Sequence, residues 1–297
     1  MSFINALPGA IAQGMIWGIM AIGVYITFRI LDVADLTVDG SIVTGACVAA
    51  VMVYNGVNVW LAMLCAFIAG LLAGLVTGIF HTLMGIPAIL AGILTQLILW
   101  SVNLKILGKP NLGIPRDPNA AITQLQKGRA ILVVGIICVA IIALLYWFFG
   151  TELGASLRAT GCNLRMSRAQ GINTNMCKIL GLMISNGIVA LSGAVLMQYQ
   201  GAADINMGRG AIVIGLAAVI IGEALLGKLS SNFAVRLFGV IVGGVIYYIV
   251  YQFVIMLGLD TDLLKMLSAL IVAIFLAIPY WRSHFGKKKQ SAKKAAD

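Results

Sequence analysis

Charged residues are scarce in this sequence. Asp, Glu, Lys and Arg make up 10% of the 297 residues, against about 25% in an average soluble domain. Hydrophobic residues reach 61%, and a soluble fold of this length has no core large enough to hide so much apolar surface. The composition therefore excludes an ordinary soluble domain. It predicts an all-α fold, specifically a polytopic helical membrane protein.

Cysteine and histidine are also few, with five and two copies, and no C-x-x-C spacing occurs. We expect the thiols to be small buried side chains, and we expect no metal site. No H-E-x-x-H or comparable constellation is present, so we predict no catalytic residues and no enzyme activity. The run Gly222–Leu229 imitates a P-loop but ends in Leu229, where a true P-loop has Ser or Thr for magnesium. We therefore expect this chain to bind no cofactor or nucleotide.

Long apolar runs predict about nine transmembrane helices (eight to ten), because a span needs about 20 mostly apolar residues. The expected spans cover 7–29, 41–55, 58–80, 87–107, 130–149, 177–199, 211–227, 237–257 and 265–281. The second and the seventh are short. Residues 1–281 thus form a single transmembrane domain, and 282–297 form a basic tail.

The basic tail indicates the orientation in the membrane. Six bases and no acid lie between Arg282 and Lys294, which is typical of a cytoplasmic segment in contact with anionic lipid. Nucleic acid is the weaker interpretation of this charge. With nine spans, the N-terminus is then extracytoplasmic, and it has the composition of a first span without a cleavable signal. Glu223 is expected to reach the membrane surface near Lys228.

Two parts of the sequence resemble each other at a spacing of about 169 residues. Gly18–Ile22 aligns with Gly187–Leu191, and Ala34–Leu36 aligns with Ala203–Ile205. The copies, about 7–110 and 177–281, begin with the first and the sixth span, an odd offset. They are therefore predicted to cross the membrane in opposite directions, an inverted repeat of the kind that many transporters use.

Polar breaks interrupt the apolar pattern at matching places in the two halves, 30–41 and 201–210. An acid at the bilayer centre is costly, so such residues usually face protein or water. We predict that broken helices line a translocation pathway here, and that half-helices after the breaks favour an anion such as an amino acid carboxylate. The alternative is that the aspartates cap helix ends at the surface. The candidate pathway residues are Asp35, Thr37, Asp39, Ser41, Asp204 and Asn206.

The segment Glu152–Lys178 is a polar island between apolar runs, with one acid and four bases. On a single helix, Arg158, Arg165 and Arg168 would share a face within about 80°, which predicts a short amphipathic helix that docks on a soluble partner. The segment contains the pattern G-x-x-L-R-A-x-G-x-N followed by A-x-G-I-N. This pattern resembles the ATPase-coupling loop of bacterial ABC importer permeases of the branched-chain amino acid and ribose type.

The resemblance covers nearly the whole chain. It is strongest at Ala34–Ser41 and Leu157–Asn173, where the chain is similar to the branch associated with aromatic amino acid (tryptophan or tyrosine) uptake. It implies a permease domain whose cytoplasmic loop, 150–176, couples to an ATPase. The implied coupling residues are Gly154, Leu157, Arg158, Ala159, Gly161, Asn163, Arg165, Arg168 and Gly171.

The resemblance also implies partners. These are a second permease copy in a homodimer, two ATPase subunits that carry ATP and magnesium, and an extracytoplasmic substrate-binding protein, all at the bacterial plasma (inner) membrane. The loop 109–119 has bases that could meet acidic residues of the binding protein, or it is simply solvated. A second function stays open, an ion-coupled secondary transporter in which Asp35 and Asp204 bind a proton or sodium ion. Import by alternating access is the first expectation.

Overall fold

The computed structural model describes residues 3–114, 127–226 and 232–256, together with the single positions 266, 270 and 273. Most of the ninth expected span and the whole basic tail lie outside these residues, as does the second part of the loop 109–119, from residue 115 on. Six helical segments in the described part are long and apolar enough to cross a membrane. The long helices are α1 (Phe3–Tyr25), α3 (Val59–Thr82), α4 (Ala88–Leu107), α5 (Lys127–Gly150), α8 (Thr174–Gln200) and α10 (Phe233–Met256).

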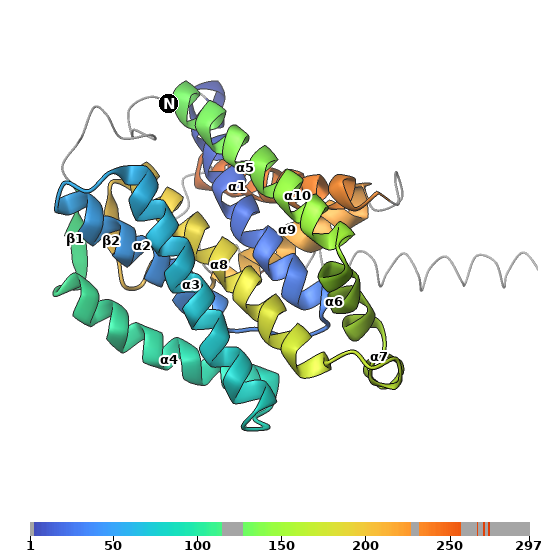
Figure 1. The fold of residues 1–297 in the computed structure, drawn as a ribbon. Helices are drawn as coiled ribbons and strands as arrows, with labels where there is room; N and C mark the ends of the chain where they lie inside the picture. The colour runs from blue at the N-terminus through green and yellow to red at the C-terminus, as the bar shows by residue number, and fades with distance from the viewer. Residues whose placement is uncertain are drawn as a thin grey trace, which may run out of the picture.

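Shorter elements connect the long helices. They are the π-helix η1 (Ile26–Ile30), which continues α1, the short apolar helices α2 (Val38–Tyr54) and α9 (Ala211–Leu226), the polar helices α6 (Glu152–Cys162) and α7 (Leu164–Ala169), and the strands β1 (Asn111–Gly113) and β2 (Ala202–Asp204). The two strands form a small antiparallel ribbon with Leu112 opposite Ala203. This ribbon is a local exception to the all-α prediction. It lies on the opposite side of the molecule from α6 and α7 in Figure 1.

The order of elements explains the two short spans that the sequence predicts. A long helix, a break, a short helix and a long helix follow one another in α1–η1, α2 and α3, and again in α8, α9 and α10. Both short helices start after a polar break, and neither has the length of a full span. A short helix after each break agrees with the sequence prediction, although α2 begins at Val38 and not at Ser41.

Helices α1 and α8 run antiparallel at the centre of the fold. Ser185 donates to the carbonyl of Gly23 at 2.8 Å, Ser192 to that of Ile16 at 2.7 Å, and Tyr199 to that of Gly9 at 3.4 Å. Donors and acceptors are each spaced seven residues apart, so the same faces of both helices meet along two heptads. The first long helices of the two halves therefore point in opposite directions.

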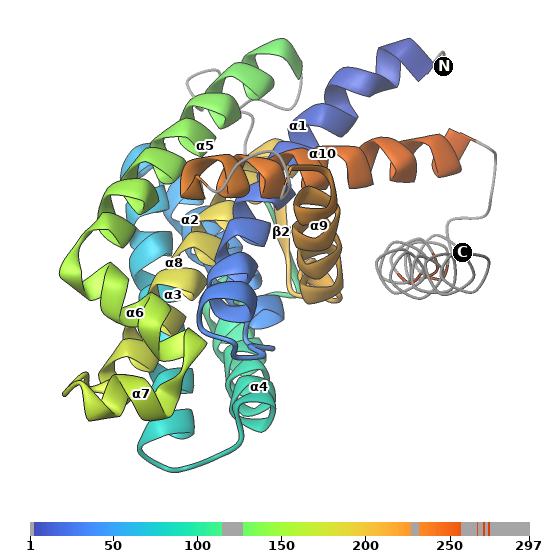
Figure 2. The same ribbon diagram turned by 90° about the vertical axis from the view of Figure 1, so that its right-hand side faces the viewer.

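Glycine brings α3 against α8. A Cβ atom on Gly70 would collide with the carbonyl oxygen of Asn186, and one on Gly74 would collide with that of Leu182. Small residues at four-residue spacing allow this close approach in a membrane. Figure 1 shows α3 beside α8, and Figure 2 shows α9 beside α10.

An ion pair joins the two halves near the end of α1. Arg29 of η1 lies 2.8 Å from Glu223 of α9, Nε to Oε1. The expectation that Glu223 extends toward Lys228 missed this contact, because nothing in the sequence shows that η1 and the end of α9 come together. Lys228 itself lies outside the described residues.

Candidate functional site

The two breaks meet at Asp39. Its carboxylate accepts hydrogen bonds from the backbone N–H groups of Gly210, at 3.0 Å, and Ile212, at 2.9 Å. The turn before α9 lies tight against the start of α2, because a Cβ atom on Gly208 would collide with the Asp39 carbonyl oxygen. Asp39 thus satisfies free N–H groups at the start of α9 and places a negative charge at the positive end of that helix. The anion expected at this half-helix is the chain's own carboxylate.

Asp35 belongs to a second, buried network. Asn186 donates its amide to Asp35 Oδ2 at 2.7 Å, and the Thr37 backbone N–H donates to Oδ1 at 2.9 Å. Ser41 in turn donates to Asn186 Oδ1 at 2.6 Å, and the Thr37 and Thr77 hydroxyls lie 2.8 Å apart. Every one of these side chains is buried. The network fixes the first break against α3 and α8, and Asn186 is the member that the sequence analysis missed.

Asp204 and Asn206 lie elsewhere. Asp204 ends β2, where its Oδ1 accepts from the Asn206 backbone N–H at 2.7 Å and its Oδ2 from the Asn111 amide at 3.3 Å. This arrangement matches the capping alternative, since the carboxylate organises its own turn. Asp35 and Asp204 therefore sit in separate networks, which does not favour an ion site shared between them. Within the described residues, no group of three or more His, Cys, Asp or Glu side chains is placed to hold a metal ion.

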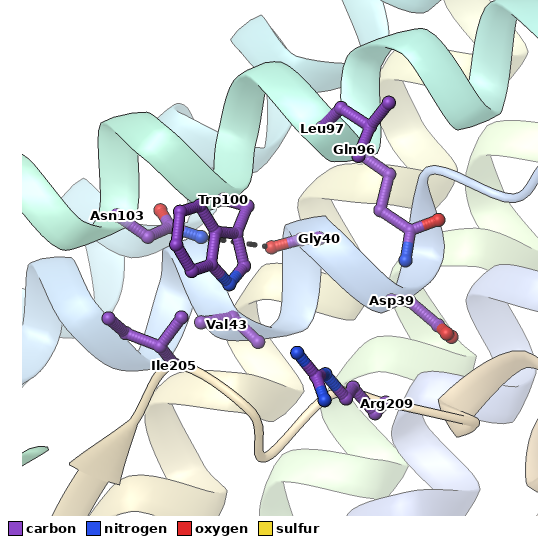
Figure 3. Close-up of a pocket in the computed structure, with 9 residues that line it drawn as sticks. All are labelled: Asp39, Gly40, Val43, Gln96, Leu97, Trp100, Asn103, Ile205 and Arg209. Carbon is purple, nitrogen blue, oxygen red and sulfur yellow. Dashed lines mark hydrogen bonds between the residues drawn. The ribbon is translucent and has the colours of Figure 1, made fainter. Parts of the chain in front are cut away.

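A cavity of about 160 Å³ lies beside Asp39, between α2, α4 and the turn after β2 (Figure 3). That volume far exceeds the roughly 10–15 Å³ that one water needs. Polar, aromatic and aliphatic side chains share its wall. The lining residues are Asp39, Gly40, Val43, Gln96, Leu97, Trp100, Asn103, Ile205 and Arg209.

Only Asp39 among these residues was a candidate from the sequence. A signal for the others was present in α4, because Gln96, Trp100 and Asn103 follow one another at the i, i+4, i+7 spacing of one helix face. Two amide side chains on one face of an apolar span are unusual, so this face of α4 could have been named as a candidate site from the sequence. Arg209 had no such signal, because a base in a polar break is ordinary.

The polar island forms two helices, not one. Asn163 separates α6 from α7 with an extended backbone (φ −157°, ψ 102°), and its side chain accepts from the N–H groups of Arg165 and Met166. Asn is a favoured helix N-cap, so a second helix starts there. The expectation of one amphipathic helix is wrong, and the shared face projected for the three arginines does not apply across the break.

The apolar members of the predicted coupling set are packing residues. A Cβ atom on Gly154 would collide with the carbonyl of Phe148, and one on Gly161 with the carbonyl of Ile30. Leu157 is fully buried. These residues let α6 lie against the ends of α5 and η1, directly before the first break.

The polar members differ in their freedom. Arg158 donates to the Phe149 carbonyl at 2.9 Å, and the Arg168 Nε donates to the Thr174 hydroxyl at 3.0 Å. Arg165 is exposed on α7. The two remaining members of the set are not polar. Ala159 is half-buried, and Gly171 follows α7 with a positive φ of 81°, a conformation that glycine adopts without strain.

Comparison with known proteins shows where this arrangement belongs. Residues 7–278 match the family model described as "Branched-chain amino acid transport system / permease component". A tyrosine transport system permease protein of Clostridioides difficile is 40% identical over 275 residues, covering 92% of this chain and 91% of that protein. An uncharacterized protein of Rickettsia prowazekii is 34% identical and covers 92% of this chain and 97% of its own length.

The fold has a solved counterpart. The structure titled an inward-facing conformation of a putative metal-chelate type ABC transporter superimposes with a TM-score of 0.50 at 14% sequence identity, covering 94% of this chain and 85% of that one. At this identity the likeness concerns the fold alone. The matched family model and the relative of 40% identity establish that the chain belongs to the family described as the branched-chain amino acid transport system permease component.

Proposed function

We propose that this chain is the membrane subunit of an ATP-driven importer for amino acids, with aromatic amino acids as its substrates. Two copies form the pathway, two separate ATPase subunits bind ATP and magnesium, and an extracytoplasmic binding protein delivers the substrate. The chain itself binds no nucleotide. The 40% identity to a protein named as a tyrosine transport permease supports the substrate class.

One observation carries the proposal: α6 touches the chain directly where the first break begins. Gly161 lies against the carbonyl of Ile30, and Gly181 of α8 lies against both Leu31 and Leu157. A force on α6 is therefore transmitted to the residues that lead into Asp35. This contact gives an ATPase docked on α6 and α7 a short mechanical route to the breaks.

The mechanism that we propose is alternating access. Closure of the ATPase dimer moves α6 and α7, the η1 end of the first break follows, and the two halves rock about their junction at Asp39. In this proposal the α6 and α7 end faces the cytoplasm of a bacterium, the N-terminus faces outward, and the tail 282–297 lies on cytoplasmic lipid. The loop 109–119 faces the binding protein.

The test is coupled transport in proteoliposomes that contain the permease, its ATPase and its binding protein. Arg165→Glu reverses an exposed charge on α7, whereas Arg158→Glu would also remove the hydrogen bond to Phe149. We expect Arg165→Glu to lower uptake of L-tyrosine and substrate-stimulated ATP hydrolysis together, without loss of expression. Arg129→Glu, at an exposed base near the start of α5, is the matched control.

Two results would contradict the proposal. Wild-type proteoliposomes that take up no amino acid on addition of ATP would refute the function itself. Uptake and ATP hydrolysis that remain unchanged in Arg165→Glu would refute the docking of the ATPase at α7.

A further inference from the structure

Four helices, α1, α8, α9 and α10, form a central block in which backbones touch. A Cβ atom on Gly14 of α1 would collide with the backbone of Val245 in α10, and one on Gly243 of α10 would collide with the carbonyl oxygen of Ala218 in α9. Hydrogen bonds join α1 to α8. Backbones packed this closely cannot shift past one another without a clash, so the block moves as a unit.

The chain leaves this block at the end of α1 with an unusual geometry. Residues 26–30 form the π-helix η1, and Asp32 follows with a positive φ of 54°. Within the described residues, no other non-glycine residue has a positive φ. Isolated π-helical turns often lie at functional sites, and both conformations are rare unless neighbouring contacts hold them. The contacts of η1 therefore decide whether the segment keeps this shape.

Arg29 ties η1 to the block. Its Nε lies 2.8 Å from Glu223 Oε1 in α9, and the two side chains are 59% and 31% exposed. Glu223 is fixed, because the preceding Gly222 lies against the Gly239 carbonyl oxygen of α10. An ion pair between exposed groups changes an equilibrium by at most about fivefold. The contact is therefore specific in its partners and still weak enough to open.

The helix α6 contacts the residue next to Arg29. A Cβ atom on Gly161 of α6 would collide with the carbonyl oxygen of Ile30. A displacement of α6 relative to the block therefore moves Ile30, and Arg29 moves with it. Glu223 stays with α9 and α10. Because the two charged groups are already in contact, this displacement separates them.

We propose that Arg29 and Glu223 form a latch, which holds η1 against α9 in the described conformation and opens when α6 moves during the transport cycle. The proposal rests on the proposed function and adds to it the residue pair that sets the balance between two conformations. The closed pair stabilises one conformation only. Loss of either charge therefore shifts the equilibrium toward the other conformation by the free energy of the pair.

The experiment measures the distance between η1 and α9 in proteoliposomes that contain the permease, its ATPase and its binding protein. Spin labels are attached at Phe28→Cys in η1 and Leu225→Cys in α9, because both side chains are exposed and neither belongs to the ion pair. The five native cysteines are replaced by alanine. Distances are recorded with and without ATP, and uptake of L-tyrosine is measured in the same proteoliposomes.

We expect a short distance without nucleotide and a second, longer distance when ATP is added. Without ATP, Arg29→Gln and Glu223→Gln should each raise the ratio of long to short distances about 2- to 5-fold, the range expected for one exposed ion pair. Combining them should add little, because either change already removes the interaction. The exchange of Arg29→Glu with Glu223→Arg should restore the wild-type ratio.

The matched control is Arg129→Gln. It removes an exposed base near the start of α5, at the opposite end of that helix from α6, and should leave the ratio unchanged. Glu223→Gln conserves the volume of the side chain, so it tests the latch even if Arg29→Gln fails to fold. A purely structural role for the pair would lower the melting temperature of these variants without changing the ratio.

The outcomes separate the two proposals. If the ratio does not respond to ATP in a chain that transports L-tyrosine, the latch is overturned and the importer stands. The latch is also overturned if the ratio in Glu223→Gln equals that in Arg129→Gln. Wild-type proteoliposomes that take up no L-tyrosine on addition of ATP overturn the proposed function instead.

Discussion

Replacing Asp39 should separate the two breaks. The side chain makes two hydrogen bonds to the start of α9, at 2.9 and 3.0 Å. Loss of an N-cap costs about 1 kcal/mol, and loss of a carboxylate at a partly buried helix N-terminus costs up to about 2 kcal/mol. We therefore expect Asp39→Ala to lower the free energy of unfolding by about 2 kcal/mol. Asp39→Asn keeps one acceptor oxygen and should lose about half of that.

The assay is thermal unfolding of the purified permease in detergent, followed by uptake in proteoliposomes. A loss of about 2 kcal/mol corresponds to a melting temperature lower by roughly 4–8 °C for a chain of this size. The control is Asp204→Ala, because Asp204 makes a similar backbone hydrogen bond within its own exposed turn. That change should cost about 0.5 kcal/mol.

The reasoning would be refuted if Asp39→Ala melted at the wild-type temperature, or if Asp204→Ala lowered it more. Uptake gives an independent check. At a temperature where both variants are folded, Asp39→Ala should transport more slowly than Asp204→Ala, because only Asp39 holds α9 against α2.

Three further changes test the packing of the halves by thermal unfolding. Gly74→Leu places a side chain against a backbone carbonyl of α8, so it should destabilise by about 1–3 kcal/mol or more and lower the yield of monodisperse protein. Asn186→Leu leaves the buried carboxylate of Asp35 without its amide donor and should cost about 3 kcal/mol, part of which Asp35→Asn in the same chain recovers. Arg29→Glu should cost less than about 1 kcal/mol, because the Arg29 side chain is 59% exposed and water screens its pair with Glu223, and exchanging both charges should restore the wild-type melting temperature.

Each of these has a result that contradicts it. The reasoning about Gly74 is contradicted if Gly74→Leu is as stable as the wild type. The reasoning about the buried network is contradicted if adding Asp35→Asn to the Asn186→Leu variant lowers its melting temperature further. For the ion pair, the contradicting result is an exchanged double variant that melts no higher than the single one.

The positions of the helices followed from the sequence because apolar length and polar interruptions are local properties. The two short helices were recognisable for the same reason, since 38–54 and 211–226 are shorter than the roughly 20 residues of a typical span and follow polar breaks. Glycines four residues apart in α3 permit a close helix approach, but this spacing does not say that α8 is the partner.

The candidate site depended on contacts that no local pattern shows. Asp39 meets Gly210 across 171 residues of sequence, and Asp35 meets Asn186 across 151. Both carboxylates were candidates, but their partners are a backbone N–H and one amide within an apolar helix. The split at Asn163 was different, because an N-cap residue before a new turn is a local signal. It was missed because the segment was read as one continuous helix.

The seven-residue spacing between α1 and α8 has a mechanical consequence. Ser185, Ser192 and Tyr199 bind carbonyls at the same interval, so sliding α8 along α1 breaks all three hydrogen bonds at once. The acceptors are main-chain carbonyls, so the same face of α1 presents the next ones only after a full helical turn, about 5.4 Å along the axis, and shorter slides leave the hydroxyl groups unpaired. The pair should therefore move as one rigid rod during the transport cycle, which leaves the breaks as the places where the chain bends.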